Sequence, residues 1–357
     1  MNNYPVYNAS IIVTRELEDE LGKILSSYPE DKVFLVTEEN CDKFCVPLIS
    51  HTTGFENLKK VVIPSGEENK KLSSVEMIWL FLSQNGADRK SLVVNIGGGM
   101  LTDLGSFAAS TIKRGMDFVN IPTTLLAQVD ASVGGKTGFN FNGLKNEIGV
   151  INQPNTVLID TRFLQTIDSE NFISGYAEMI KHGLINSAEH LEEVRSFDLK
   201  NPDFEILRGI IARSVAIKDS FVFQDPNERN IRKALNFGHT IGHAFESAAL
   251  YSGRPILHGY AVAFGMIAEL YLSHKVCNLP LSVLNELSDW LISVYGKYKI
   301  EENQFEAFYQ LMTHDKKNEG TRVNFTLIPA VGEVVINQNC DKPLIFKALQ
   351  CFKQLSI

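Results

Sequence analysis

The sequence is poor in cysteine and has no long apolar segment. Its 357 residues include five cysteines, none in a Cys-x-x-Cys pair, which argues against a disulfide framework and a zinc ribbon. No apolar run reaches the roughly 18 residues that a membrane-spanning helix requires. The first residues also lack the basic and apolar regions of a secretion signal. We therefore expect a cytoplasmic protein with reduced thiols and no membrane partner.

The sequence also contains fewer basic than acidic residues. Lys and Arg number 34 against 42 Asp and Glu, for a net charge of -8. Because nucleic-acid binding depends on basic surfaces that neutralise phosphates, we expect no nucleic-acid partner. Hydrophobic residues make up 44% and charged residues 21%, which is typical of a globular protein and not of a disordered one. At about 150 residues per domain, the length suggests two domains.

The first half of the chain alternates short apolar runs with longer amphipathic stretches, a pattern typical of βαβ units. The expected strands cover residues 32–36, 61–63, 92–96, 118–121 and 156–159. Beyond residue 160, long segments have helical spacing, and residues 323–328 with 334–336 suggest a small hairpin. We expect an α/β domain with a mainly parallel sheet at 1–165 and a mostly helical domain at 166–357.

A glycine-rich turn follows the third expected strand. Gly97, Gly98 and Gly99 precede a helix start, where backbone amides could approach a pyrophosphate. Thr102 occupies the third glycine position of the usual dinucleotide motif, and the nearest suitable acid is Glu38, upstream of the turn. The pattern alone leaves a plain tight turn and a cofactor site about equally open. Residues 132–137 are not a P-loop, because Asp130 stands where that motif needs its first glycine.

Three histidines suggest a metal site. His239 and His243 lie four residues apart on one helix face, and His258 follows 15 residues later. On an earlier segment, Glu178 shares a face with Lys181 and His182. Two imidazoles and a carboxylate suit zinc with one position open to substrate, although buried polar residues of the core are the alternative interpretation. The spacing cannot decide which histidine stays off the metal.

Basic residues lie in or beside these motifs, although each taken singly is typical of a solvated surface. They are Lys113, Arg114, Lys136, Lys145, Lys181, Lys218, Arg232, Lys233, Lys316 and Lys317. A charge-assisted contact contributes about 1.5–3 kcal/mol, whereas the distant net charge is screened beyond about 8 Å. A small substrate with several negative charges is therefore compatible with an acidic protein.

Motifs along nearly the whole chain carry a family resemblance. They cover residues 64–70, 97–103, 110–115, 121–130, 134–138, 145–146, 177–181, 232–246, 258–259 and 315–317. With these motifs the chain resembles the 3-dehydroquinate synthases of the sugar-phosphate cyclase superfamily. The resemblance implies a metal- and NAD-dependent phosphorus–oxygen lyase of the shikimate pathway, which leads to aromatic amino acids, and a homodimer.

The resemblance also implies ligands for both cofactors. Zinc, with cobalt as an alternative, would be bound by Glu178, His239 and His258, leaving His243 near the substrate phosphate. The NAD contacts would be Glu38, Asn40, Glu67, Lys70, Gly98, Gly99, Asp103, Thr123, Thr124 and Lys145. Glu38 departs from the aspartate expected there, and Thr102 replaces a small glycine.

The implied substrate is an anionic sugar phosphate, 3-deoxy-D-arabino-heptulosonate 7-phosphate. Its phosphate would contact Lys136, Asn146, His243 and Lys316, with Arg114 from a second subunit; its carboxylate would contact Lys181, Lys218, Arg232 and Asn236. Asp130 is also expected among the catalytic residues. Transient oxidation by NAD, phosphate elimination, re-reduction, ring opening and an intramolecular aldol reaction would yield 3-dehydroquinate.

Other functions remain as alternatives. A metal-dependent polyol dehydrogenase would share the two-domain plan but needs no phosphate-binding cations. Other sugar-phosphate cyclases, with valiolone or inosose products, are disfavoured by Arg232, Asn236 and His243, which supply partners for a carboxylate and a constrained phosphate. A catalytically inactive binding protein is disfavoured because every polar role is filled.

Overall fold

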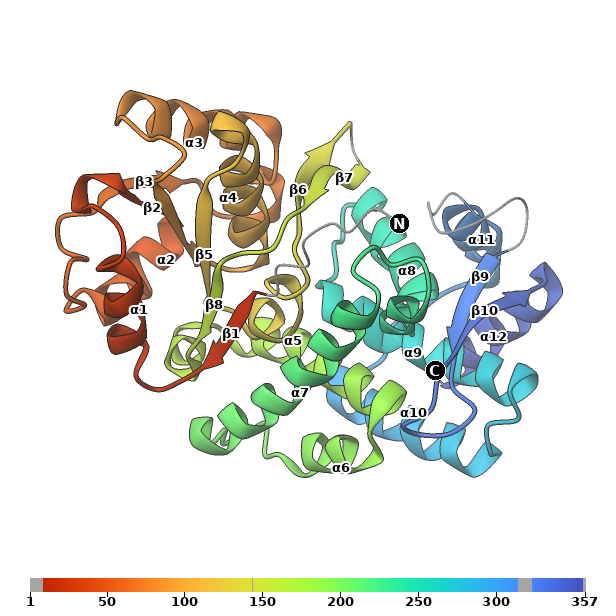
Figure 1. Ribbon diagram of the computed structural model, residues 1–357. Coiled ribbons are helices and arrows are strands. Elements are labelled where there is room, and N and C mark those ends of the chain that lie inside the picture. The colour runs from red at the N-terminus through yellow and green to blue at the C-terminus, as the bar shows by residue number, and fades with distance from the viewer. Residues whose placement is uncertain (1–8, 143, 314–322, 356–357) are drawn as a thin grey trace. The chain divides into compact units, whose positions relative to one another are not determined.

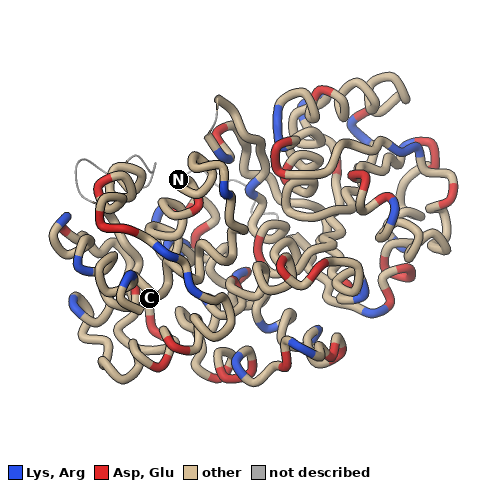
Figure 2. The backbone as a smooth tube through the Cα atoms, turned by 180° about the vertical axis from the view of Figure 1, so that it is seen from behind, with Lys and Arg blue, Asp and Glu red and all other residues tan. Residues whose placement is uncertain are grey.

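The computed structural model describes residues 9–142, 144–313 and 323–355 (Figure 1). The chain forms two compact units. Unit 1 comprises the chain up to Asp168 together with Asp203–Val215, and unit 2 comprises Ser169–Pro202 with the chain from Ala216 onward. Helix α7 (Phe204–Gln224) therefore begins in unit 1 and ends in unit 2. Basic and acidic residues are interspersed along both units (Figure 2).

Unit 1 is built on a parallel sheet with strand order β1-β8-β5-β4-β2-β3. The strands are β1 (Ser10–Val13), β2 (Val33–Glu38), β3 (Lys59–Ile63), β4 (Leu92–Gly97), β5 (Asp117–Pro122) and β8 (Thr156–Ile159). Strands β2 and β4 are buried at every position, as expected where helices cover both faces of a sheet. The five expected strands and the parallel sheet are confirmed. Edge strand β1 was missed.

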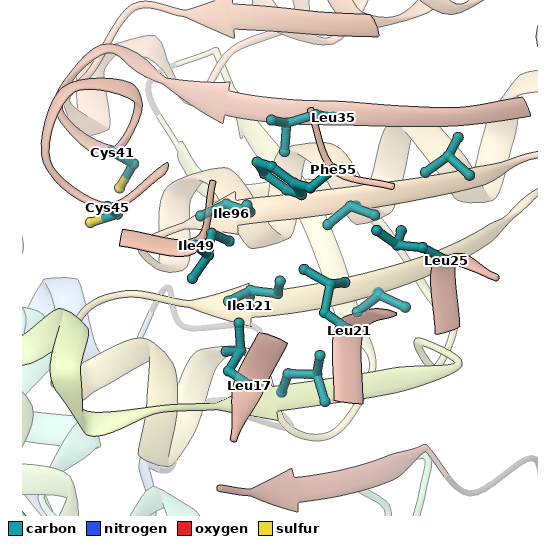
Figure 3. Close-up of a cluster of buried hydrophobic side chains, with 14 of the residues drawn as sticks. Leu17, Leu21, Leu25, Leu35, Cys41, Cys45, Ile49, Phe55, Ile96 and Ile121 are labelled. Carbon is teal, nitrogen blue, oxygen red and sulfur yellow. The ribbon is translucent and has the colours of Figure 1, made fainter. Parts of the chain in front are cut away.

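Helices pack on both faces of this sheet (Figure 1). They are α1 (Leu17–Leu25), α2 (Glu39–Phe44), α3 (Leu72–Gln84) and α4 (Gly99–Thr111). Successive strand residues point to opposite faces, so Leu35 packs with α1 in one apolar cluster while Val36 packs with α3 and α4 in the other. Figure 3 shows Leu17, Leu21 and Leu25, spaced by one helical turn, along the first cluster. An antiparallel hairpin, β6 (Lys136–Phe141) with β7 (Leu144–Ile151), packs against α4.

Unit 2 is mostly helical, as expected. Besides the end of α7, it contains α5 (Ser169–Asn186), α6 (Ala188–Ser196), α8 (His239–Tyr251), α9 (His258–Val276), α10 (Leu281–Tyr295), α11 (Phe305–Thr313) and α12 (Lys342–Leu355). Strands β9 (Val323–Leu327) and β10 (Val335–Cys340) pair antiparallel, which confirms the expected hairpin. All five cysteines are free thiols. Within the described ranges, no helix has the length and hydropathy needed to cross a membrane.

A two-bond ion pair ties α1 to the end of the sheet in unit 1. The Nη1 and Nη2 atoms of Arg162 each lie 2.5 Å from a carboxylate oxygen of Glu18. These hydrogen bonds hold the pKa of Glu18 below its usual value, against a smaller opposing effect of burial. Such a group adds stability above its unfolded pKa of about 4.3, and the contribution disappears as pH falls through the folded value.

The Arg162→Met variant is therefore expected to be less stable near neutrality. Its free energy of unfolding should fall by about 1 kcal/mol at pH 7 and by less at pH 3, as measured by urea denaturation. Arg208→Met is the control for the two-bond contact, because Arg208 bonds the exposed Glu205 in the same way, whereas Arg162 also donates from Nε to Asp160 Oδ2 at 2.7 Å. An equal loss at both pH values in Arg162→Met would contradict the expectation.

Candidate functional site

In unit 1, two neighbouring strands end at the residues expected to bind a dinucleotide. Strand β2 ends at Glu38 and the adjacent β4 ends at Gly97. The chain leaves β2 for β3 on one side, whereas it leaves β4 for β5 on the other. Such a reversal of strand order creates a crevice at the carboxyl ends, where open α/β sheets bind ligands. The sheet topology thus places the acid and the glycine turn side by side.

The glycine turn leads directly into α4. A Cβ on Gly98 would lie 3.1 Å from Thr124 Cγ2, and one on Gly99 would lie 3.1 Å from Ala131 Cβ, so both positions are crowded for a larger residue. Thr102 is buried, and its hydroxyl donates to the Gly99 carbonyl at 3.2 Å. The threonine therefore bonds within its own helix, and the amide end of α4 keeps the geometry of an anion site.

The Glu38 carboxylate caps the short helix α2. Its Oε2 accepts from the Asn40 amide at 2.9 Å, and its Oε1 accepts from the Cys41 amide at 2.8 Å. The Ser65 hydroxyl also donates to Oε2. Both carboxylate oxygens of Glu38 are therefore engaged at the start of α2.

A buried lysine links residues expected to serve two different ligands. Lys70 Nζ lies 2.5 Å from Asp103 Oδ2 and donates to Asn146 Oδ1 at 2.6 Å. Burial would lower the pKa of Lys70, but the carboxylates of Asp103 and Glu67 outweigh it and raise the pKa. Asn140 completes the group by donating to Glu67 and accepting from the Asn146 amide. Hence the expected nucleotide residues Glu67, Lys70 and Asp103 form one network with Asn146.

The other expected residues of unit 1 lie on the hairpin and on turns. Thr123 follows β5, and its amide donates to the Gly97 carbonyl at 3.0 Å. Asp130 lies in a π-helical turn over Ala127–Ala131. Lys136 and Lys145 are exposed residues of β6 and β7.

Arg114 lies in a left-handed turn with φ 69°, next to Lys113 with φ 52°. Non-glycine residues adopt this region at a cost, so the surroundings must hold the turn in place. Arg89 does so by donating from Nε to the Lys113 carbonyl at 2.8 Å. Arg89 and Arg114 line a pocket of about 460 Å³.

In unit 2, the expected metal ligands converge on one buried oxygen. Glu178 of α5 is fully buried, and its Oε1 lies 3.5 Å from His239 Nε2 and 3.6 Å from His258 Nε2. Among the described residues, no donor makes a hydrogen bond to this oxygen. A tetrahedral zinc ion with bonds of about 2.0–2.2 Å places neighbouring ligand atoms roughly 3.3–3.6 Å apart. Each of the two distances from Glu178 Oε1 therefore matches the spacing of ligand atoms that share one ion.

The second oxygen of Glu178 contacts the buried Lys181 ammonium. Burial would raise the pKa of Glu178, but Lys181 and His258 outweigh it and hold the pKa well below its usual range. The carboxylate is thus charged, which a metal ligand requires.

The remaining ring nitrogens of both histidines are engaged. His258 Nδ1 lies 3.3 Å from Glu246 Oε2, and His239 Nδ1 lies 3.2 Å from the Phe237 carbonyl. Metal-binding histidines usually bond a carboxylate or carbonyl through the nitrogen that does not face the ion. Burial lowers the pKa of His258, yet Glu178 and Glu246 together raise it to about 10.

His243 lies close to His239 and His258, so the structure alone does not decide which of the three histidines stays off the metal. One ring nitrogen from each of His239, His243 and His258 can be chosen so that all lie within 4.8 Å of one another. The contacts of Glu178 Oε1 with His239 and His258 favour those two as its co-ligands. The assignment of Glu178, His239 and His258 remains a prediction.

Unit 2 also buries the cations expected to bind the substrate carboxylate. Lys181, Lys218 and Arg232 are at most 5% exposed. Asn236 donates to Glu228 Oε1 at 3.1 Å, and Arg232 donates from Nη1 to the Pro226 carbonyl at 2.7 Å. Cations in a low-dielectric interior attract an anionic ligand more strongly than cations in water, so this unit suits such a ligand. Lys316 lies outside the described residues.

Sequence reasoning assigned no role to several carboxylates of unit 2. Asp225 accepts from the backbone amides of Arg229, Asn230 and Arg232 at 2.6–3.2 Å and so shapes the loop that leads to Arg232. Glu228 and Glu246 contact expected site residues, as described above. Each contact joins residues that are not neighbours in the sequence, and no motif spacing indicates them.

Comparisons with known proteins identify the family. Models described as 3-dehydroquinate synthase N-terminal and C-terminal match residues 60–174 and 175–318. A 3-dehydroquinate synthase of Parabacteroides distasonis is 48% identical over 96% of this chain and 98% of its own length. The chain belongs to the 3-dehydroquinate synthase family. A relative from Dictyoglomus thermophilum is 37% identical over 94% of this chain and 96% of its own.

Solved structures share the fold at lower identity. A 2-epi-5-epi-valiolone synthase from Streptomyces hygroscopicus with NAD+ and Zn2+ bound has a TM-score of 0.86 at 22% identity, covering 99% of both chains. A 2-deoxy-scyllo-inosose synthase complexed with carbaglucose-6-phosphate, NAD+ and Co2+ has a TM-score of 0.81 at 23% identity, covering 97% of this chain and 96% of its own. The expected family and fold class are confirmed.

Proposed function

We propose that the protein converts 3-deoxy-D-arabino-heptulosonate 7-phosphate to 3-dehydroquinate and phosphate, using NAD and a divalent metal ion. The observation that carries the proposal is the buried Glu178 Oε1 flanked by two imidazole Nε2 atoms, within a unit that also buries Lys181, Lys218 and Arg232. Metal-binding geometry next to buried cations suits an anionic substrate with a reacting hydroxyl. The relatives named 3-dehydroquinate synthase support the same reaction.

Glu178, His239 and His258 would hold zinc or cobalt, which when bound supplies a Lewis acid for a substrate hydroxyl. Residues at the carboxyl ends of β2 and β4 would hold NAD, which accepts a hydride and later returns it. The protein itself contributes orientation and charge. Lys181, Lys218, Arg232 and Asn236 bind the substrate carboxylate, whereas Lys136, Asn146, His243 and Lys316 bind its phosphate, and Asp130 completes the catalytic set. Bound in one orientation, a flexible substrate gains large effective molarity.

A direct assay separates this reaction from its rivals. Purified protein is mixed with the heptulosonate phosphate, zinc and trace NAD, and inorganic phosphate and NADH absorbance are followed. The amount of phosphate released should exceed the amount of NAD many-fold, because each NAD is used repeatedly, and NADH should not accumulate. Because an iron-containing alcohol dehydrogenase shares the fold with a TM-score of 0.69 at 13% identity, NADH production from a simple alcohol would support the dehydrogenase alternative. Absence of phosphate release would contradict the proposal.

His243 provides a test of the ligand assignment. Because His243 is not among the assigned ligands, His243→Ala should keep one equivalent of zinc, measured by elemental analysis. Its kcat should fall by about 10²–10⁴-fold, the range for a lost proton-transfer or charge-stabilising group. His274→Ala is the control, since His274 bonds the Leu279 carbonyl at the end of α9. Loss of zinc from His243→Ala would show that His243 is a ligand.

We further expect a homodimer in which Arg114 serves the neighbouring active site. Arg114 is exposed on its left-handed turn, as a residue that contacts a second chain must be. Mixing inactive Arg114→Ala and Glu178→Gln subunits should restore about 25% of the activity, because half of the dimers then carry one intact site. No recovery after verified subunit exchange would place Arg114 in the site of its own chain.

A further inference from the structure

A buried carboxylate joins the two helices that begin with the expected metal-binding histidines. Glu269 of α9 is 0% exposed. Its Oε2 accepts from the Gly238 amide at 2.6 Å, and its Oε1 accepts from the Ile241 amide at 3.0 Å. Gly238 is the N-cap of α8, which starts at His239, and Ile241 lies in its first turn. Glu269 therefore caps a helix that is remote in sequence.

This cap replaces one that the local sequence does not supply. The first amides of a helix lack intrahelical acceptors, and the N-cap side chain usually satisfies one of them. The N-cap of α8 is Gly238, which has no side chain and adopts a left-handed conformation with φ 80°. A carboxylate is also favoured at a helix N-terminus by the partial positive charge there. From its place on α9, Glu269 supplies both the missing hydrogen-bond acceptor and the negative charge at the N-terminus of α8.

The two helices touch through their backbones at this place. A Cβ on Gly265 would lie 2.0 Å from the Gly238 carbonyl oxygen, and one on Gly238 would lie 2.9 Å from the Val262 carbonyl oxygen. This close contact leaves little freedom for α8 to slide along α9. The hydrogen bonds of the Glu269 carboxylate further fix the position of α8 along α9.

A second contact secures the start of α9 against α5. The amide of Gly259, which follows His258, donates to Ser174 Oγ at 3.0 Å. Ser174 lies one helical turn before Glu178 on α5. Hydrogen bonds between backbone and side chain thus connect all three helices that carry the expected ligands.

We propose that Glu269 is a positioning residue of the metal site, holding His239 at a fixed place relative to His258 before the ion binds. The proposal rests on the proposed function, because it assumes that these histidines bind a metal. Ligands that are already ordered bind an ion more tightly than ligands that must be ordered by it. Supporting contacts outside the coordination shell commonly change metal affinity by about 10–100-fold.

The test compares two variants of α9 by their metal affinity. In Glu269→Gln, the amide group would face a backbone N–H, so only one of the two hydrogen bonds can persist. Competition with a chromophoric chelator should show about 10–100-fold weaker binding of Zn2+, and the visible spectrum of the Co2+ form should change. The control is Ser273→Ala: Ser273 is equally buried and bonds the Ile328 amide and the Glu269 backbone carbonyl, neither of which belongs to α8. Its zinc affinity should stay within about twofold of wild type.

The proposal would be overturned if Glu269→Gln bound zinc as tightly as wild type. It would also be overturned if Ser273→Ala, at the same stability, lost as much zinc affinity as Glu269→Gln. If wild-type protein bound no zinc, the proposed function would fail instead. Should Glu269→Gln not fold, amide hydrogen exchange of the wild-type protein decides the question. Gly238 and Ile241 should remain protected after zinc is removed, and rapid exchange of both amides would overturn the proposal.

Discussion

Replacement of Glu178 by glutamine is expected to abolish metal binding and to lower kcat by about 10³-fold or more, which corresponds to several kcal/mol of lost transition-state stabilisation. The amide lacks the negative charge that balances the ion. It would also leave the buried Lys181 ammonium without its carboxylate neighbour. Elemental analysis for zinc and the rate of phosphate release are the two measurements.

The control for this variant is Glu170→Gln. Glu170 is exposed in the first turn of the same helix, so its replacement removes an acid from α5 without touching the histidines. It should retain zinc and activity. A Glu178→Gln protein with a full equivalent of zinc would contradict the ligand assignment. Urea denaturation of the metal-free proteins separates metal loss from unfolding.

Replacement of Lys70 by methionine is expected to destabilise unit 1 by about 3 kcal/mol, because it removes one partner of a largely buried ion pair. The side chain of Lys70 is 6% exposed and that of Asp103 is 17% exposed. Asp103 would keep its charge with no cation at 2.5 Å, and Asn146 would lose the donor at 2.6 Å. Chemical denaturation measures the stability, and calorimetric titration measures NAD affinity, which should also fall.

A double variant separates these two effects. Lys70→Met with Asp103→Leu removes both charges, so most of the lost stability should return, whereas NAD binding should not. Full recovery of NAD affinity in the double variant would show that the pair serves folding alone. A single variant as stable as wild type would contradict the buried ion pair itself.

Much of the fold could be predicted because its signals are local. Strands β2 and β4 are buried throughout and are mostly apolar in sequence, and the glycine turn after β4 marks a helix start. Strand β1 was missed because it has only four residues, lies at the sheet edge and is nowhere fully buried. The return of residues 203–215 to unit 1 could not be predicted either, since a helix that crosses between units has no distinctive periodicity.

The sequence by itself determined the residue types of the site and their local spacing. His239 and His243 share a helix face because 3.6 residues complete a turn, and the family motifs add Glu178 and His258. Only the tertiary structure decided that one Glu178 oxygen faces two imidazoles, that Lys70 joins Asp103 to Asn146, and that Glu269 caps a distant helix. The reason is physical: helical periodicity orients side chains over a few turns, whereas contacts between separate elements depend on how those elements pack.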